Sequence, residues 1–169
     1  MNKINVGIIY GGKSTEHEVS IRSAKSVFEA LNKEKYNVSL IHITKQGEWL
    51  LANNNEEITT LDNANSRKLS VVPSKGLMAD EEIIKIDAVL PILHGTAGED
   101  GSIQGLLELA EIPYAGCNVR SSAVCMDKDM TKRLLELKGI GVAPSIVLNY
   151  YEKDEQTYEH AKEKLGVPM

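Results

Sequence analysis

Two apolar runs that each end in a glycine-containing polar loop constrain the fold of this chain most. Residues 4–10 (INVGIIY) lead into Gly11-Gly12, and residues 86–93 (IDAVLPIL) lead into His94-Gly95. Short apolar runs rich in β-branched residues are typical of buried parallel strands, and a helical spacing of apolar residues follows each loop. The chain is therefore predicted to be an α/β protein with ligand-binding loops at one edge of its sheet.

The remaining elements of the first two thirds of the chain extend this pattern. We expect a helix at 18–31 capped by Ser14 or Thr15, a strand at 36–44, a hairpin-like excursion at 45–85 with a strand at 69–73, a helix at 102–110 and a short strand at 112–116. Strand, helix and strand in this order predict a right-handed βαβ unit. The fold class expected is a Rossmann-like, doubly wound parallel sheet.

The character of the sequence changes after Gly116. Helices are expected at 121–126, 128–138 and 155–165, with a strand at 145–149. We therefore place a first domain at residues 1–120 and the truncated start of a second at residues 121–169. Because residues 166–169 (GVPM) read as the approach to an apolar strand, we expect the chain to continue in a longer protein.

Composition excludes several classes of protein. The net charge is −5, from 24 acidic and 19 basic residues, which does not indicate a nucleic-acid-binding surface. The apolar runs are far too short for a membrane span, and the N-terminus lacks a signal-peptide pattern, so a cytoplasmic protein is expected. The two cysteines, Cys117 and Cys125, lack metal-ligand spacing and are interpreted as small packed residues in a reducing compartment.

The first candidate loop comprises residues 11–20 (GGKSTEHEVS). Its glycines permit close approach of a ligand, and its carboxylates Glu16 and Glu18 suit a cationic group better than a phosphate. The loop has neither the GxGxxG spacing of dinucleotide-binding folds nor a P-loop ending in frame. A second interpretation stays open, in which Glu16 and Glu18 only favour the helix start through its dipole.

The second candidate loop comprises residues 94–105 (HGTAGEDGSIQG), with one histidine, two acids and four glycines in twelve positions. His94 is placed to donate a hydrogen bond to a carboxylate, and Asp100 to cap the helix that follows. We interpret Glu99 and Asp100 as residues that shape the loop rather than as catalytic groups.

Both loops, together with residues 121–135 (SSAVCMDKDMTKRLL), resemble the signature motifs of the D-alanine-D-alanine ligase family, which includes the related ligases of vancomycin resistance. The resemblance covers essentially the whole chain. It implies a pre-ATP-grasp N-terminal domain followed by the beginning of an ATP-grasp domain. It also implies a cytoplasmic enzyme of peptidoglycan precursor synthesis, in which ATP phosphorylates one D-alanine and the amine of a second attacks the acyl phosphate.

The resemblance assigns roles to four residues of this chain. Glu16 is the catalytic candidate and binds the ammonium group of the first D-alanine, Val19 packs beside that substrate, and His94 orients its carboxylate. Lys128 reaches the phosphates of ATP as a point charge. The ligands of Mg²⁺ or Mn²⁺ are expected outside this chain, so no metal ligand is assigned here and the chain alone is expected to be inactive. A homodimer formed through the N-terminal domain is also implied.

Three other functions remain to be weighed. A D-alanine-D-serine or D-alanine-D-lactate ligase would share both loops. A non-catalytic, amino-acid-binding Rossmann-like module is the alternative from a different class. A dinucleotide-dependent oxidoreductase is disfavoured, because the first loop lacks GxGxxG and no ribose-binding acid follows the second strand.

Overall fold

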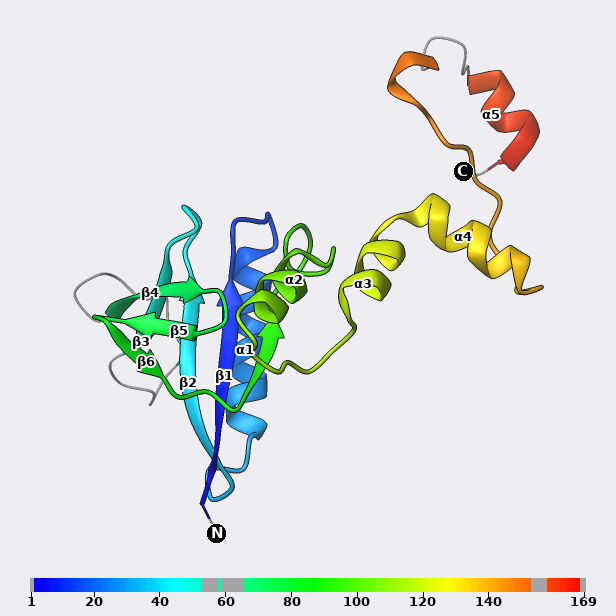
Figure 1. Cartoon of the computed structure of the whole chain (residues 1–169). Coiled ribbons are helices and arrows are strands. Elements are labelled where there is room, and N and C mark those ends of the chain that lie inside the picture. The colour runs from blue at the N-terminus through cyan, green and yellow to red at the C-terminus, as the bar shows by residue number, and fades with distance from the viewer. Residues whose placement is uncertain (1, 53–57, 59–65, 153–157, 168–169) are drawn as a thin grey trace. The chain divides into compact units, whose positions relative to one another are not determined.

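The computed structural model describes residues 2–52, 58, 66–152 and 158–167 (Figure 1). It separates into two compact units, residues 1–126 and 127–169. The helix α3 (Val119–Met126) therefore groups with the first unit. The boundary at residues 120 and 121 that was predicted from the sequence stays a prediction.

Within its described residues, the first unit contains a mixed sheet and three helices. Its elements are β1 (Ile4–Gly11), α1 (His17–Ala30), β2 (Tyr36–Ile43), β3 (Trp49–Ala52), β4 (Ser66–Val72), β5 (Gly76–Ala79), β6 (Glu82–Ile84), β7 (Ala88–Ile92), α2 (Ser102–Leu109) and α3 (Val119–Met126). Among the described residues, the strands form one sheet in the order β6-β5-β4-β3-β2-β1-β7.

Strand β1 is the parallel centre of the sheet. It pairs in parallel with β2, with Val6 opposite Val38, and with β7, with Val6 opposite Ala88. These pairings confirm the Rossmann-like α/β class and the βαβ unit. Strands β3 to β6 pair in antiparallel fashion, as the hairpin-like excursion predicted, so the sheet is mixed rather than parallel throughout. The connections at residues 73–75 and 80–81 are too short for the crossover that parallel pairing of β4, β5 and β6 would require.

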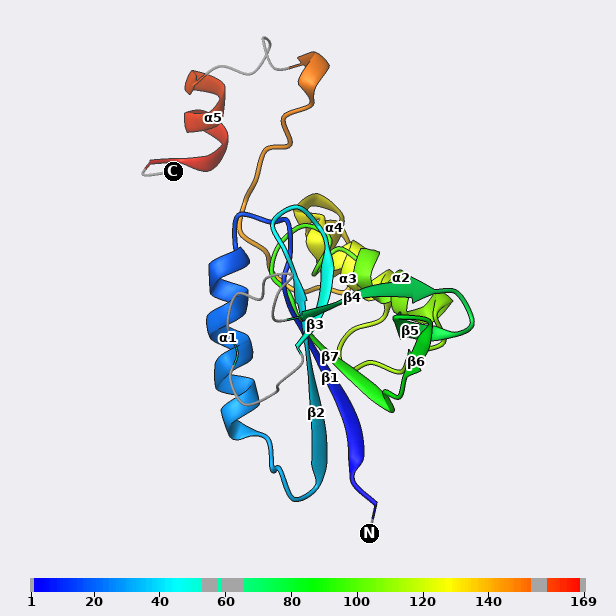
Figure 2. The ribbon, with the colours of Figure 1, turned by 90° about the vertical axis from the view of Figure 1, so that its left-hand side faces the viewer.

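Helices cover the two faces of the sheet (Figure 2). Successive side chains of β1 point to opposite faces, so Ile9 joins one apolar cluster while Ile8 and Tyr10 join the other. The Ile9 cluster includes Ile103 and other residues of α2, and the second cluster includes Ala24 of α1. Burial on both faces explains why β1 is an almost continuous apolar run.

Two local expectations in the first unit need correction. The run at 112–116 does not form a strand, because only Tyr114 makes a parallel bridge, to Val89. The residue that precedes α1 is Glu16, and its side chain makes no capping hydrogen bond. The hydroxyl of Ser14 instead accepts a hydrogen bond from the backbone N–H of Glu16.

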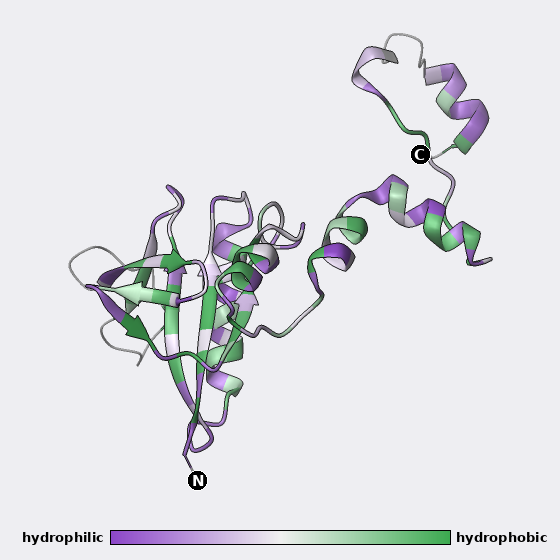
Figure 3. Cartoon of the chain, in the orientation of Figure 1, coloured by the Kyte–Doolittle hydropathy of each residue, from purple (hydrophilic) through white to green (hydrophobic). Residues whose placement is uncertain are grey.

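The second unit contains α4 (Lys128–Leu137), the short 3-10 helix η1 (Tyr150–Glu152) and α5 (Tyr158–Leu165). Asp127 caps α4 by accepting a hydrogen bond from the backbone N–H of Met130 at 2.9 Å. Hydrophobic and hydrophilic residues alternate along α4 (Figure 3). The predicted helix at 155–165 is observed from Tyr158, and its residues 155–157 lie outside the described ranges.

The strand predicted at 145–149 is wrong. Residues 145–149 have no regular structure, and Leu148 in this segment is 64% exposed. A strand needs a neighbour for its backbone hydrogen bonds, and the described residues of this unit supply none. Within the described ranges, every helix is too short or too polar to cross a lipid bilayer.

Candidate functional site

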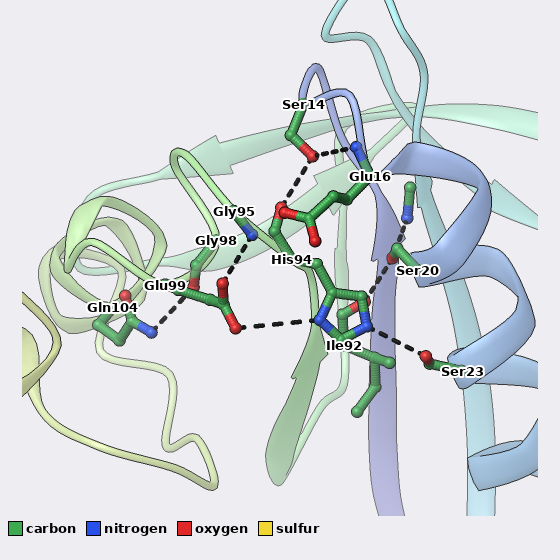
Figure 4. Close-up of polar contacts among 11 residues, drawn as sticks. Ser14, Glu16, Ser20, Ser23, Ile92, His94, Gly95, Gly98, Glu99 and Gln104 are labelled. Carbon is green, nitrogen blue, oxygen red and sulfur yellow. Dashed lines mark hydrogen bonds and ion pairs between the residues drawn. The ribbon is translucent and has the colours of Figure 1, made fainter. Parts of the chain in front are cut away.

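The two candidate loops meet at the carboxyl ends of the parallel strands. Hydrogen bonds of Ser14 join them, because its hydroxyl donates to the backbone carbonyl of His94 at 2.8 Å. Ser20, which is fully buried, forms a second connection by accepting from the N–H of Gly11 at 2.8 Å and donating to the carbonyl of Ile92 (Figure 4). The loops after β1 and β7 are therefore held in one arrangement by two serines.

The carboxylate of Glu16 lies beside the backbone of the second loop. A Cβ atom added to Gly95 would lie 2.5 Å from Oε2 of Glu16, which shows how closely the carboxylate approaches this glycine. Gly95 also has a φ of +71°, a conformation that glycine adopts at little cost. Glu16 is exposed, and its carboxylate accepts no hydrogen bond and forms no ion pair among the described residues. The group is consequently available to a cationic ligand.

Glu18, the other carboxylate of the first loop, already has a partner. Its Oε1 atom lies 2.8 Å from Nζ of Lys45, and both side chains are largely exposed. The hydrogen bond and the charge of Lys45 hold the pKa of Glu18 below its ordinary value. The alternative interpretation was that both acids only favour the start of α1 through the helix dipole. It fits Glu18 better than Glu16.

His94 is oriented from both sides of its ring. Its Nε2 atom lies 3.0 Å from the hydroxyl of Ser23, and its Nδ1 atom lies 3.9 Å from Oε1 of Glu99. The second distance is too long for a hydrogen bond. The expected donation of a hydrogen bond from His94 to a carboxylate therefore stays a prediction. The histidine side chain remains about a third exposed, at 30%.

Glu99 and Asp100 shape the second loop, as predicted. Glu99 accepts from the N–H of Gly95 at 2.8 Å, while Asp100 accepts from Ala97 at 2.8 Å and from Ser102 at 3.0 Å. Partial burial opposes ionisation of Asp100, but these backbone donors outweigh it, and its pKa lies below the ordinary value. Ser102 begins α2, so Asp100 satisfies one of the free N–H groups of that helix.

Val19 and Lys128 occupy less enclosed positions. Val19 lies three residues after Glu16, on the same side of the start of α1, and is 40% exposed. Lys128 is the first residue of α4 in the second unit and is exposed. The structure thus brings Glu16 close to the loop that contains His94, and it places Val19 in the first turn of α1 and Lys128 at the start of α4.

Two pockets flank His94. One, of about 230 Å³, lies between the loops and is lined mostly by apolar groups that include Trp49, Leu93 and Ile103. The other, of about 360 Å³, is lined by Glu99 and by polar residues around the start of α3. His94 lines both pockets, while Glu16 lines neither and lies at the open surface between the loops.

The two cysteines are both exposed to solvent. Cys117 and Cys125 are free and exposed, so the expectation that they pack in the interior is wrong. Within the described part of the chain, no group of three or more His, Cys, Asp or Glu side chains is arranged to hold a metal ion.

Sequence reasoning missed Ser20 and Ser23 as residues of the site. The signal was present, because Glu16, Ser20 and Ser23 follow the three-to-four residue spacing of one helix face. Their partners, however, come from β7 and the loop after it, and pairings across 71 or 72 positions have no local signature.

Comparison with known proteins identifies the family of this chain. Residues 5–117 match the family model described as the D-ala D-ala ligase N-terminus. The whole chain is 40% identical to a D-alanine-D-alanine ligase of Proteus mirabilis and 42% identical to one of Shouchella clausii, and in each case it covers 50% of the relative. The chain therefore spans about half the length of the curated relatives it matches.

Solved structures give the same result. The VanG D-Ala:D-Ser ligase from Enterococcus faecalis matches with a TM-score of 0.82 and 40% identity, over 91% of this chain and 47% of that protein. A D-alanine-D-alanine ligase from Coxiella burnetii matches with a TM-score of 0.79 and 39% identity, over 85% of this chain and 43% of that protein.

Proposed function

This chain belongs to the D-alanine-D-alanine ligase family, and on that premise we propose that the full-length protein is an ATP-dependent ligase that joins two D-alanines. ATP phosphorylates the carboxylate of the first D-alanine. The amine of the second then attacks the acyl phosphate, which gives the dipeptide, ADP and phosphate. The dipeptide serves peptidoglycan precursor synthesis.

The observation that carries this proposal is the carboxylate of Glu16, which lies beside Gly95 without a partner among the described residues. We assign it to the ammonium group of the first D-alanine. A carboxylate and an ammonium group form a charge-assisted hydrogen bond, which is stronger than a neutral one. Glu18 is a poorer candidate because Lys45 already neutralises its charge.

His94 and Val19 complete the proposed subsite for the first D-alanine. His94 directly precedes Gly95, beside which the Glu16 carboxylate lies, and contacts with Ser23 and Glu99 limit the orientations of the His94 ring. We assign it to the substrate carboxylate, which is the group that ATP phosphorylates. Val19, partly exposed on the same side of α1, packs against the substrate methyl group.

Lys128 is the proposed contact with the ATP phosphates. Asp127 caps α4 and fixes the helix start at which Lys128 lies, and a lysine suits a phosphate as a compact point charge. Mg²⁺ or Mn²⁺ neutralises phosphate charge when it is bound. No step of the proposal uses a metal ion held by the described residues, because they contain no suitable cluster.

The proposal includes an organisation and a location for the whole protein. Residues 1–120 form the substrate domain and residues 121–169 begin the ATP-binding domain, and the protein forms a homodimer through the first of these. We place it in the cytoplasm, which supplies ATP. The free, exposed thiols of Cys117 and Cys125 are typical of a reducing compartment.

Phosphate release tests the proposal directly. The full-length protein, incubated with ATP, magnesium and D-alanine, is expected to release phosphate, whereas the 169-residue chain under the same conditions is not. Binding of D-alanine without phosphate release by the full-length protein would instead support a non-catalytic amino-acid-binding module.

A second candidate function is a D-alanine-D-serine ligase, which the similarity to the VanG protein favours. The assay is therefore repeated with D-serine and with D-lactate added beside D-alanine. Mass spectrometry of the product identifies the acceptor, since the mixed dipeptide, the depsipeptide and the D-alanine dipeptide differ in mass.

A further inference from the structure

Two buried histidines lie beneath the first loop and have no part in the proposed chemistry. His17 is the first residue of α1 and His42 belongs to β2, and each is only 2% exposed. Their rings meet edge to face with centroids 5.4 Å apart. A buried polar side chain is costly unless its hydrogen bonds are satisfied, so the contacts of this pair define its role.

The contacts of His17 select one tautomer. Its Nδ1 atom lies 2.6 Å from the backbone carbonyl of Gly12, and a carbonyl oxygen only accepts, so Nδ1 carries the proton. In a neutral ring, Nε2 of His17 is then an acceptor. That atom lies 3.5 Å from Nε2 of His42, which must therefore be the donor.

The ring of His42 has a second neighbour, which belongs to β1. The ring of His42 stacks on Tyr10, with centroids 5.2 Å apart, and burial raises the pKa of Tyr10 far above its ordinary value. Tyr10 is thus uncharged at neutral pH and places no charge beside the ring of His42.

The histidine pair helps to hold the backbone of the loop that contains Glu16. Gly12 donates from its N–H to the carbonyl of Ile43 at 2.7 Å and accepts from His17 through its own carbonyl, so both sides of this residue are held. His17 directly follows Glu16 in the chain. The bond from His17 to Gly12 therefore fixes the width of the turn that presents the Glu16 carboxylate.

The position of the His42 ring is equally restricted. A Cβ atom at Gly11, whose φ is +90°, would lie 2.8 Å from Cδ2 of His42 and 2.3 Å from the carbonyl oxygen of Ile43. Only glycine allows the turn to pass this close to the ring. The loop backbone and the two rings are consequently one packed unit.

We propose that His17 is a positioning residue that holds the Gly12–Glu16 turn in the geometry that binds the first substrate, and that His42 donates a hydrogen bond to the other ring nitrogen of His17. The link to substrate binding rests on the proposed function. The hydrogen-bonding arrangement of the two histidines does not.

Nitrogen NMR tests the arrangement without any reference to activity. In the full-length protein labelled with ¹⁵N-histidine, ring nitrogen shifts distinguish a protonated nitrogen from an unprotonated one. The expected result is a proton on Nδ1 of His17 and on Nε2 of His42. A proton on Nε2 of His17 in its neutral form would overturn the proposal.

Kinetics of matched variants test the positioning role. The amide nitrogen of Asn can occupy the place of Nδ1, so His17→Asn keeps the donor to Gly12, while His17→Leu keeps the volume and removes the donor. We expect His17→Leu to raise the KM for the first D-alanine on the order of tenfold without changing the KM for ATP. His17→Asn should stay within about threefold of the unaltered enzyme.

The outcomes separate this proposal from the proposed function. Equal KM values for the Asn and Leu variants would overturn the positioning role. Parallel changes in the KM values for D-alanine and for ATP would overturn it too. His160→Gln, in the exposed part of α5, is the matched control and should change neither constant. If the unaltered enzyme shows no turnover, the proposed function fails, and the NMR tautomers still decide whether the histidine pair holds the turn.

Discussion

The Nε2 atom of His94 lies 3.0 Å from the hydroxyl oxygen of Ser23, although the two residues are 71 positions apart. The hydrogen bond connects the second turn of α1 with the loop that follows β7. His94 has its other ring nitrogen directed to Glu99. The hydrogen bond at Nε2 and the longer contact at Nδ1 limit the orientations of the ring, as a residue assigned to a substrate carboxylate requires.

Ser23→Ala in the full-length enzyme should weaken binding of the first D-alanine. Loss of one hydrogen bond of about 1 kcal/mol corresponds to a roughly fivefold higher KM for this substrate. Steady-state kinetics with varied D-alanine measure the change, and the KM for ATP should not move. Ser26→Ala is the control, because Ser26 lies one turn further along α1 and bonds only to the carbonyl of Arg22. Equal effects of both substitutions would contradict the role of Ser23.

Glu16→Gln should weaken binding of the first D-alanine far more than binding of ATP. A charge-assisted hydrogen bond of roughly 1.5–3 kcal/mol corresponds to a loss of about ten- to a hundredfold in affinity. Glu18→Gln, which removes only the exposed pair with Lys45, should leave both affinities nearly unchanged. An equal loss for both ligands, or for neither, would remove Glu16 from the site.

The sequence predicted those parts of the fold whose signals are local. The run at 4–10 and the segment at 36–44 each contain enough apolar, β-branched residues to indicate buried strands, and both are observed as β1 and β2. The capping role of Asp100 was equally local, because its partners Ala97 and Ser102 lie three and two residues away, respectively. Such interactions can be inferred from residue types and spacing alone.

Parts of the site that depend on distant partners could not be predicted. Nothing near Ser23 in the sequence indicates that it faces His94, and nothing near Glu18 identifies Lys45 as its partner. The apolar residues at 145–149 gave a local strand signal, but a strand forms only beside another strand. In each case tertiary structure, rather than local propensity, decides the outcome.

Lys128→Ala should lower the affinity of the full-length enzyme for ATP, because the variant loses a positive charge proposed to contact the phosphates. We expect a rise of about tenfold in the KM for ATP, with the KM for the first D-alanine unchanged. Lys138→Ala, at the opposite end of α4, is the control for general loss of charge. Circular dichroism should show the same helix content in both variants, and an unchanged KM for ATP would sink the assignment.

Asp100 should make the folded chain sensitive to acid. Its pKa in the folded state lies below its ordinary value of 3.8, so its contribution to stability is complete above that value. The contribution is lost as the pH falls through the lower pKa of the folded state, because protonation weakens its bonds to Ala97 and Ser102. Urea unfolding at pH 3 to 7 measures the free energy of unfolding. This free energy should fall less on acidification for Asp100→Asn than for the unaltered chain.

Ser20→Ala should destabilise the first unit more than any exposed serine substitution. Ser20 is fully buried, and its hydroxyl satisfies both the N–H of Gly11 and the carbonyl of Ile92. The methyl group of alanine leaves both backbone groups without this partner, at a cost of roughly 1–3 kcal/mol for each group that remains buried and unsatisfied. Urea unfolding of the 169-residue chain measures the change in the free energy of unfolding, with Ser26→Ala as the exposed control on the same helix.

Because Gly11 and Ile92 end β1 and β7, loss of the Ser20 hydroxyl should also increase hydrogen exchange at the N–H of Gly11. Equal unfolding free energies for the Ser20 and Ser26 variants would mean that Ser20 does not hold the two strand ends together.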